Sequence, residues 1–352
     1  MLKTASPTAS KAPRPRLFYL DLLRVWAIIA VVLLHAITPI LSHIGYFGSR
    51  SWYTSVFLNE FARTGVPLFL MISGSLLLSD KRSTDLPRFY KKRLPRLLIP
   101  LLCWHTIYYV YYACTGAADA GVSSYFSQLF GSGSAYHMWF VYSLLGIYLI
   151  TPFLKRITDS CSPKALCVLL LILLFPGTLR PLWNMTTGFY VFLFDPLMEC
   201  YLGYFLAGYL LANIRITRLV RVLYPLCGIC GFLLGFVGNL RASSAEALSY
   251  PFNGGYTLNH YLLAGALFLL ARDLTEGHTP PAWLTRPAAY LSDIAFGVYW
   301  IHVLALEYAP RLIVPDTAPI LLCLLQFLAV IAASLLLMAV LARIPAVRKL
   351  LM

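Results

Sequence analysis

The chain has 352 residues, of which 59% are hydrophobic and 12% charged, and its formal net charge is +14. Soluble domains carry roughly 25% charged residues, so this composition excludes an ordinary water-soluble domain and indicates a protein of the lipid bilayer. The lysines and arginines lie mainly in the loops predicted to face the cytoplasm, so membrane topology explains the positive net charge and no nucleic-acid partner is needed.

The chain opens with residues 1–16, rich in Ser, Ala, Pro, Lys and Arg, which predict a disordered basic tail. The apolar run 20–41 that follows is too long for a signal peptide and is predicted as the first membrane span. Further stretches of roughly 17–25 apolar residues are predicted as spans. They are 54–79, 94–114, 136–154, 164–180, 190–211, 219–239, 256–271, 288–309 and 318–342.

The predicted fold is therefore all-α: a polytopic integral membrane protein with about ten transmembrane helices. A single membrane domain is expected over 17–345, with a short cytoplasmic tail over 346–352. Both termini are predicted to be cytoplasmic, because most of the 28 lysines and arginines then fall in inside segments. The outside loops would hold only Arg50, Arg180, Arg241 and Arg311.

The first predicted span carries Asp21, Arg24 and His35. Helical geometry places Arg24 and His35 within about 20° of one helix face and about 16 Å apart in depth. Arg24 paired with Asp21 is compatible with a simple interfacial anchor. His35 lies too deep to reach water along the lipid, so it must face protein or a wet cavity, either as a structural histidine or as a general base.

A basic loop precedes the third span. Lys81, Arg82 and Arg88 are best explained as topology determinants. Arg93 and Arg96 stand at the mouth of the span, where guanidinium groups can bind a phosphate-bearing ligand bidentately.

Other ionisable groups form a layer within the predicted spans. Counting from the span ends places Glu60, Glu199 and His302 near the depth of His35, where a carboxylate could orient the imidazole. An equally open interpretation is structural. Glu60 and Arg63 would then form an ion pair, and Asp195 and Glu199 would cap or hydrate the outer end of their helix.

Most aromatic residues are attributed to interfacial belts, although Trp139 and Tyr299 are candidate substrate-binding residues, as is His302. His105 and His137 are interpreted as structural or interfacial. The motifs GxxxxGK[ST], HExxH and GxSxG do not occur, which argues against phosphotransferase, zinc hydrolase and serine-esterase chemistry, and no metal is expected.

With these residues considered, the chain resembles acyltransferase family 3 membrane proteins, and most closely the enterobacterial common antigen O-acetyltransferase branch. The similarity is carried nearly end to end by LDLLRVWAIIAVVLLHA (20–36), VPLFLMISGSLLL (66–78), KKRLPRLLIP (91–100), HMWFVYSLLGIYLITP (137–152) and FGVYWIH (296–302).

The resemblance implies that Arg24 and His35 form the family's Arg-x10-His motif and that Arg93 and Arg96 form its Arg-x-x-Arg motif, serving catalysis and acyl-CoA handling. The expected function is transfer of an acetyl or other short acyl group from cytoplasmic acyl-CoA to a cell-surface glycan or lipid-linked saccharide. The expected site comprises His35, Glu199 and Glu60 as catalytic groups and Arg24, Arg93 and Arg96 as donor-binding groups, in the inner (plasma) membrane.

Two alternatives remain open from the sequence. One is a transporter or flippase in which His35 and the carboxylates relay protons, although no internal repeat supports it. The other is a membrane sensor or scaffold.

Overall fold

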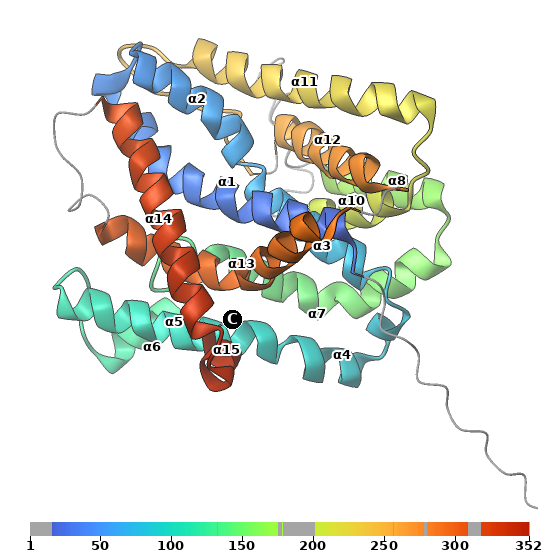
Figure 1. Cartoon of the computed structure of the whole chain (residues 1–352), viewed down its shortest axis with the longest axis horizontal. Helices are drawn as coiled ribbons and strands as arrows, with labels where there is room; N and C mark the ends of the chain where they lie inside the picture. The colour runs from blue at the N-terminus through green and yellow to red at the C-terminus, as the bar shows by residue number, and fades with distance from the viewer. Residues whose placement is uncertain are drawn as a thin grey trace, which may run out of the picture.

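A computed structural model of the chain describes residues 16–131, 133–174, 178, 201–255, 257–277, 280–308 and 318–351. Within these ranges every regular element is helical (Figure 1). The elements are α1 (Phe18–Ser42), η1 (Ile44–Tyr46), α2 (Arg50–Ala62), α3 (Gly65–Leu77), η2 (Lys81–Thr84), α4 (Leu86–Arg93), α5 (Pro95–Cys114), α6 (Val122–Phe130), α7 (Trp139–Ser160), α8 (Pro163–Leu174), α10 (Leu202–Asn213), α11 (Arg218–Ala242), α12 (Leu258–Thr275), α13 (Ala282–Tyr308), α14 (Pro319–Leu341) and α15 (Pro345–Leu351).

Six helical segments of the described chain are long and apolar enough to cross a bilayer. They correspond to α1, α4 with α5, α7, α11, α13 and α14. The prediction of an all-α protein is therefore confirmed, whereas six candidate spans, rather than the predicted ten or so, are found among the described residues. The predicted spans 164–180 and 190–211 lie partly outside the described residues, which include α8 and α10 from them.

The predicted second span, 54–79, is not one continuous helix. It is divided into α2 and α3 by a tight turn at Arg63 and Thr64, where the Thr64 amide donates to the Phe61 carbonyl at 3.1 Å. The Thr64 hydroxyl accepts a hydrogen bond from Trp26 Nε1 of α1 at 3.1 Å. The turn therefore lies beside the middle of α1, at a depth where helices are broken only when protein groups satisfy the freed backbone.

Helix α1 occupies the middle of the bundle, in contact with α2, α3, α12, α13 and α14 (Figure 1). Close approach is possible where glycine removes the side chain. A Cβ on Gly65 would lie 2.7 Å from the Ala27 carbonyl oxygen, and one on Gly74 would lie 1.8 Å from the Phe205 carbonyl oxygen. Small residues of this kind let membrane helices pack backbone to backbone, which fixes α3 between α1 and α10.

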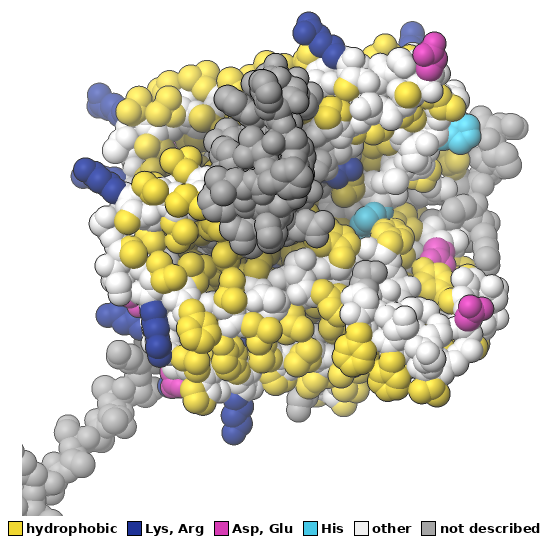
Figure 2. Space-filling model, turned by 180° about the vertical axis from the view of Figure 1, so that it is seen from behind, with side chains coloured by type: hydrophobic (Ala, Val, Ile, Leu, Met, Phe, Trp, Pro, Cys, Tyr) yellow, Lys and Arg dark blue, Asp and Glu magenta, His cyan; other side chains and the backbone are white. Residues whose placement is uncertain are grey.

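The surface of the bundle agrees with a membrane location. Hydrophobic side chains spread over the face shown in Figure 2, and most of its lysine and arginine side chains lie around the rim of that face. The cytoplasmic orientation of the termini remains a prediction from loop charge. The predicted C-terminal tail includes α15, which packs on α5 through the hydrogen bond from Trp104 Nε1 to the Leu351 carbonyl at 3.1 Å.

Candidate functional site

A cavity of about 310 Å³ lies towards the N-terminal end of α1. Its lining brings together the three arginines that the sequence analysis assigned to donor binding: Arg24 from α1, Arg93 from the end of α4 and Arg96 from the start of α5. Ser73, Tyr148 and Ser292 add hydroxyl groups to the same wall. We call it the inner cavity. It presents three permanently charged guanidinium groups and several hydroxyls, a combination suited to phosphate oxygens.

Arg24 is held by neighbours on two helices. Its Nη1 donates to the Ser292 hydroxyl of α13 at 3.0 Å and lies 3.4 Å from the Asp21 carboxylate. Arg16, just before α1, also binds Asp21, at 2.6 and 2.9 Å, and it reaches Asp293 at 3.0 Å. Hydrogen bonds to these two carboxylates raise the pKa of Arg16 above its ordinary value. Because Asp21 is shared with Arg16, it neutralises Arg24 only in part, which leaves positive charge at the cavity.

A second cavity, of about 570 Å³, lies further along α1 and is lined by His35. We call it the outer cavity. Trp139 and Tyr299, the predicted substrate-binding aromatics, line it together with Tyr136, His137 and Arg63. His35 therefore faces a cavity, as the sequence analysis required of a histidine at this depth.

Three imidazoles meet beside this cavity. The ring of His302 stacks on His35 with centroids 5.3 Å apart, and the ring of His137 lies 5.1 Å from that of His302. His302 Nδ1 lies 2.6 Å from the Tyr299 carbonyl oxygen, so Nδ1 carries the proton and Nε2 keeps its lone pair. Among the described residues, His302 Nε2 has no hydrogen-bond partner. Buried polar atoms without partners are uncommon, and this one lies in a ring stacked on His35, which lines the outer cavity.

The inner and outer cavities meet at two aromatic residues. Phe140 and Tyr299 line both cavities, and their rings pack edge to face with centroids 5.5 Å apart. The Tyr299 hydroxyl donates to the His137 carbonyl at 2.5 Å, which fixes the ring. These two side chains form a partition between the arginines and His35.

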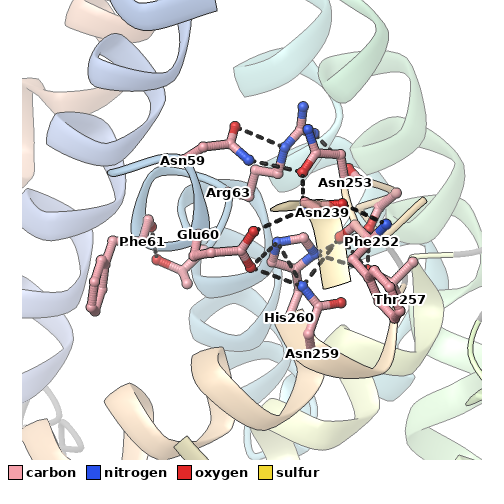
Figure 3. A network of polar contacts seen from close by, with 12 residues as sticks. Asn59, Glu60, Phe61, Arg63, Asn239, Phe252, Asn253, Thr257, Asn259 and His260 are labelled. Atoms are coloured by element: carbon pink, nitrogen blue, oxygen red, sulfur yellow. Dashed lines mark hydrogen bonds and ion pairs between the residues drawn. The ribbon is translucent and has the colours of Figure 1, made fainter. Parts of the chain in front are cut away.

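Glu60 has partners other than the one considered at the sequence level. Its two carboxylate oxygens accept hydrogen bonds from Asn239 of α11 and Asn259 of α12, each at 3.0 Å, and His260 lies 3.8 Å away (Figure 3). No contact joins Glu60 to His35 in the described chain, so equal depth did not bring them together. Glu199, the other predicted carboxylate, lies outside the described residues, as does Asp195.

The direct ion pair between Glu60 and Arg63, one of the two interpretations left open by the sequence, is not found; neutral amides lie between the two side chains. Arg63 Nε donates to Asn59 Oδ1 at 3.1 Å, and its Nη1 donates to the Asn253 carbonyl at 2.6 Å. The Asn253 side-chain oxygen in turn accepts from Asn59 and Asn239 at 2.8 and 2.9 Å (Figure 3). The network therefore connects Glu60 to Arg63 through neutral amides.

Two residues of the site were missed by sequence reasoning. His137 was interpreted as structural or interfacial because it precedes a span, yet only 2% of it is exposed and it lies beside His302. Arg63 was considered only as an ion-pair partner, yet it lines the outer cavity. The available signal was that His137 begins the segment 137–152, which carries the family resemblance. In the part of the chain that the structure describes, no group of three or more His, Cys, Asp or Glu residues is placed to hold a metal ion.

The fold and cavities define a multi-pass, all-α membrane protein with a basic inner cavity and an imidazole-lined outer one. Residues 17–343 match the acyltransferase domain of acyltransferase family 3. The chain therefore belongs to acyltransferase family 3 and is an acyltransferase, which confirms the resemblance at the level of the family. Comparison with curated proteins gave no match, and comparison with solved structures gave none either.

Proposed function

We propose that this acyltransferase moves an acetyl or other short acyl group from cytoplasmic acyl-CoA onto a hydroxyl of a cell-surface glycan or lipid-linked saccharide. The observation that carries the proposal is the arrangement of two cavities along α1, one lined by Arg24, Arg93 and Arg96 and the other by His35. Loop charge and the family resemblance support the inner (plasma) membrane, with the arginines on the cytoplasmic side.

The donor end is assigned to the inner cavity. The phosphates of acyl-CoA would bind Arg93 and Arg96, with Arg24 beneath them, because guanidinium groups form charge-assisted pairs with phosphate oxygens. Arg24 and His35 are about 16 Å apart along the helix axis. An extended pantetheine arm covers such a distance, provided that it passes the partition of Phe140 and Tyr299.

The reaction is assigned to His35. An imidazole nitrogen takes the proton from the acceptor hydroxyl, and the oxygen attacks the thioester carbonyl carbon. The new ester bond forms as the carbon–sulfur bond breaks, and the proton passes from His35 to the departing thiolate. The alternative route, in which His35 carries the acyl group briefly before transfer, uses the same residue and the same cavities.

His302 is assigned a supporting role. Its Nε2 lone pair, in a ring stacked on His35, can accept a hydrogen bond from the acceptor hydroxyl or from His35. Trp139 and Tyr299 offer aromatic faces on which the apolar face of a sugar ring can pack. The outer cavity falls in the roughly 300–1,000 Å³ range of ligand pockets, enough for a sugar unit.

The test is acyl transfer by membranes that contain the protein. Radiolabelled acetyl-CoA is supplied, and label in the glycan fraction is measured for wild type, His35→Ala and the control His43→Ala, an exposed histidine at the end of α1. The proposal expects label with wild type and the control, and background label with His35→Ala at equal protein level. Transfer that survives His35→Ala would remove His35 from catalysis.

A further inference from the structure

Arg63 is the only permanently charged residue among those that line the outer cavity in the described chain. The other lining groups are aliphatic, aromatic, hydroxyl or imidazole, and no carboxylate of the described residues lies within ion-pair distance of its guanidinium. A charged side chain at membrane depth costs roughly 2.5–3.5 kcal/mol on insertion scales, so an arginine that no described carboxylate pairs with calls for a functional explanation.

The break between α2 and α3 places Arg63 beside the outer cavity. Arg63 is the C-cap residue of α2, at the turn that divides the second span, and the start of α3 packs on the Ala27 carbonyl of α1. Arg63 therefore lies near the middle of α1, beside the cavity that contains His35. If α2 and α3 were one continuous helix, no helix end would lie beside this cavity.

The described residues hold the guanidinium on one side only. Nε and Nη1 donate to Asn59 and to the Asn253 carbonyl, whereas no described residue forms a hydrogen bond with Nη2. Behind these amides stands Glu60, whose oxygens are occupied by Asn239 and Asn259 (Figure 3). The Glu60 carboxyl is thus separated from the Arg63 guanidinium by neutral amides, so a ligand anion does not have to displace it.

We propose that Arg63 is an anion-binding residue of the outer cavity that recognises a carboxylate or phosphate carried by a substrate, which makes an acidic saccharide the preferred acceptor class. The assignment of the anion to the acceptor rests on the proposed function, whereas the binding experiment below does not require acyl transfer. A preorganised guanidinium is suited to an oxyanion when, as among the described residues here, no carboxylate lines its cavity and one of its donors has no partner. The aromatic rings beside it suit the sugar that would carry the anion.

The same chemistry has a second possible carrier, since the acyl group of a dicarboxylic donor such as succinyl-CoA also ends in a carboxylate near His35. The experiment separates the two carriers. Purified protein in lipid nanodiscs is melted in the presence of methyl β-D-glucuronide or methyl β-D-glucoside, and separately with succinyl-CoA or acetyl-CoA. Wild type, Arg63→Gln, Arg63→Lys and Arg50→Gln are compared, the last being an exposed arginine on the same helix.

The expected result is a larger Tm increase with glucuronide than with glucoside in wild type and Arg50→Gln. Arg63→Gln should lose this difference, with affinity for glucuronide weaker by about tenfold or more, and Arg63→Lys should keep part of it. A difference confined to succinyl-CoA over acetyl-CoA, and lost in Arg63→Gln, would overturn the acceptor assignment in favour of the donor. Equal responses to charged and neutral ligands in wild type, or a difference that survives Arg63→Gln, would overturn the anion site itself.

A location control uses chemical modification. Diethyl pyrocarbonate labels accessible imidazoles, and mass spectrometry reports the labelling of His35. Glucuronide should protect His35 in wild type and not in Arg63→Gln. His35→Ala protein should still discriminate glucuronide from glucoside in melting, so a failure of the catalytic role of His35 is distinguishable from a failure of the anion site.

Discussion

Replacing Gly235 of α11 with alanine tests whether the Glu60 network holds the site together. An added Cβ would lie 1.9 Å from Glu60 Oε2 and 2.5 Å from Asn259 Nδ2, far inside ordinary contact distance, which begins near 3.4 Å. Glu60 is fully buried, so its carboxylate has no solvent into which it can move. The new methyl group must therefore separate the carboxylate from the amide that donates to it at 3.0 Å.

The expected cost follows from two terms. A hydrogen bond to a charged group contributes about 1.5–3 kcal/mol in soluble proteins, and overpacking costs about 1–3 kcal/mol. Polar contacts within membranes are often weaker than in soluble proteins, so we expect Gly235→Ala to lower stability by about 2–4 kcal/mol. In the Gly235→Ala protein, Arg63 would also lose its fixed position. The protein would then no longer prefer glucuronide to glucoside.

The assay is thermal unfolding of the purified protein in nanodiscs, with Gly146→Ala as control. A Cβ on Gly146 of α7 would meet no atom within 4 Å, so this variant should melt as wild type or slightly above it. Gly235→Ala protein that melts with wild type and still distinguishes the two glycosides would refute the claim that the network positions Arg63.

The remaining predictions concern the inner cavity and its boundary. Arg93→Gln and Arg96→Gln should each weaken CoA binding about tenfold, measured by titration calorimetry. Arg156→Gln, at an exposed arginine of α7, is the control and should leave the affinity unchanged. Unchanged affinity in both Arg93→Gln and Arg96→Gln would contradict the donor site. Phe140→Trp should overfill the partition at a cost of about 1–3 kcal/mol, which slows acyl transfer about tenfold or more; equal rates would show that the donor does not pass Phe140. Arg16→Gln should lower stability by about 1 kcal/mol, seen in thermal unfolding, because Asp21 is buried but Arg16 is 47% exposed and screened by water. An unchanged Tm would mean that the Arg16 contacts do not hold α1 to α13.

Much of the architecture was predictable because apolar length is a direct physical signal in a bilayer. The first span was predicted over 20–41 and α1 runs from Phe18 to Ser42. The division of the second span was missed, although Gly65 and Pro67 directly follow Thr64 and are residues that often mark a helix boundary. The turn is stabilised by α1, through Trp26 and the close approach of Gly65, and such contacts do not show in the local sequence.

The site shows the same limit. The periodicity of one helix placed Arg24 and His35 on a common ridge, and each lines a cavity along α1. Depth alone suggested that Glu60 lies near His35, but depth does not give the direction in which a side chain points, and Glu60 points to α11 and α12. His137 was assigned to an interface because its distance from a span end does not show that the preceding loop folds inward.

The most direct measurement is mass spectrometry of surface glycans from three strains: one with the wild-type protein, one without it and one with His35→Ala at the same protein level. The account predicts a mass increase of one acyl group only in the wild-type strain, and that increment identifies the donor's acyl group and the acceptor together. Glycans that keep the acyl group in the His35→Ala strain, or that never carry one in the wild type, would contradict it.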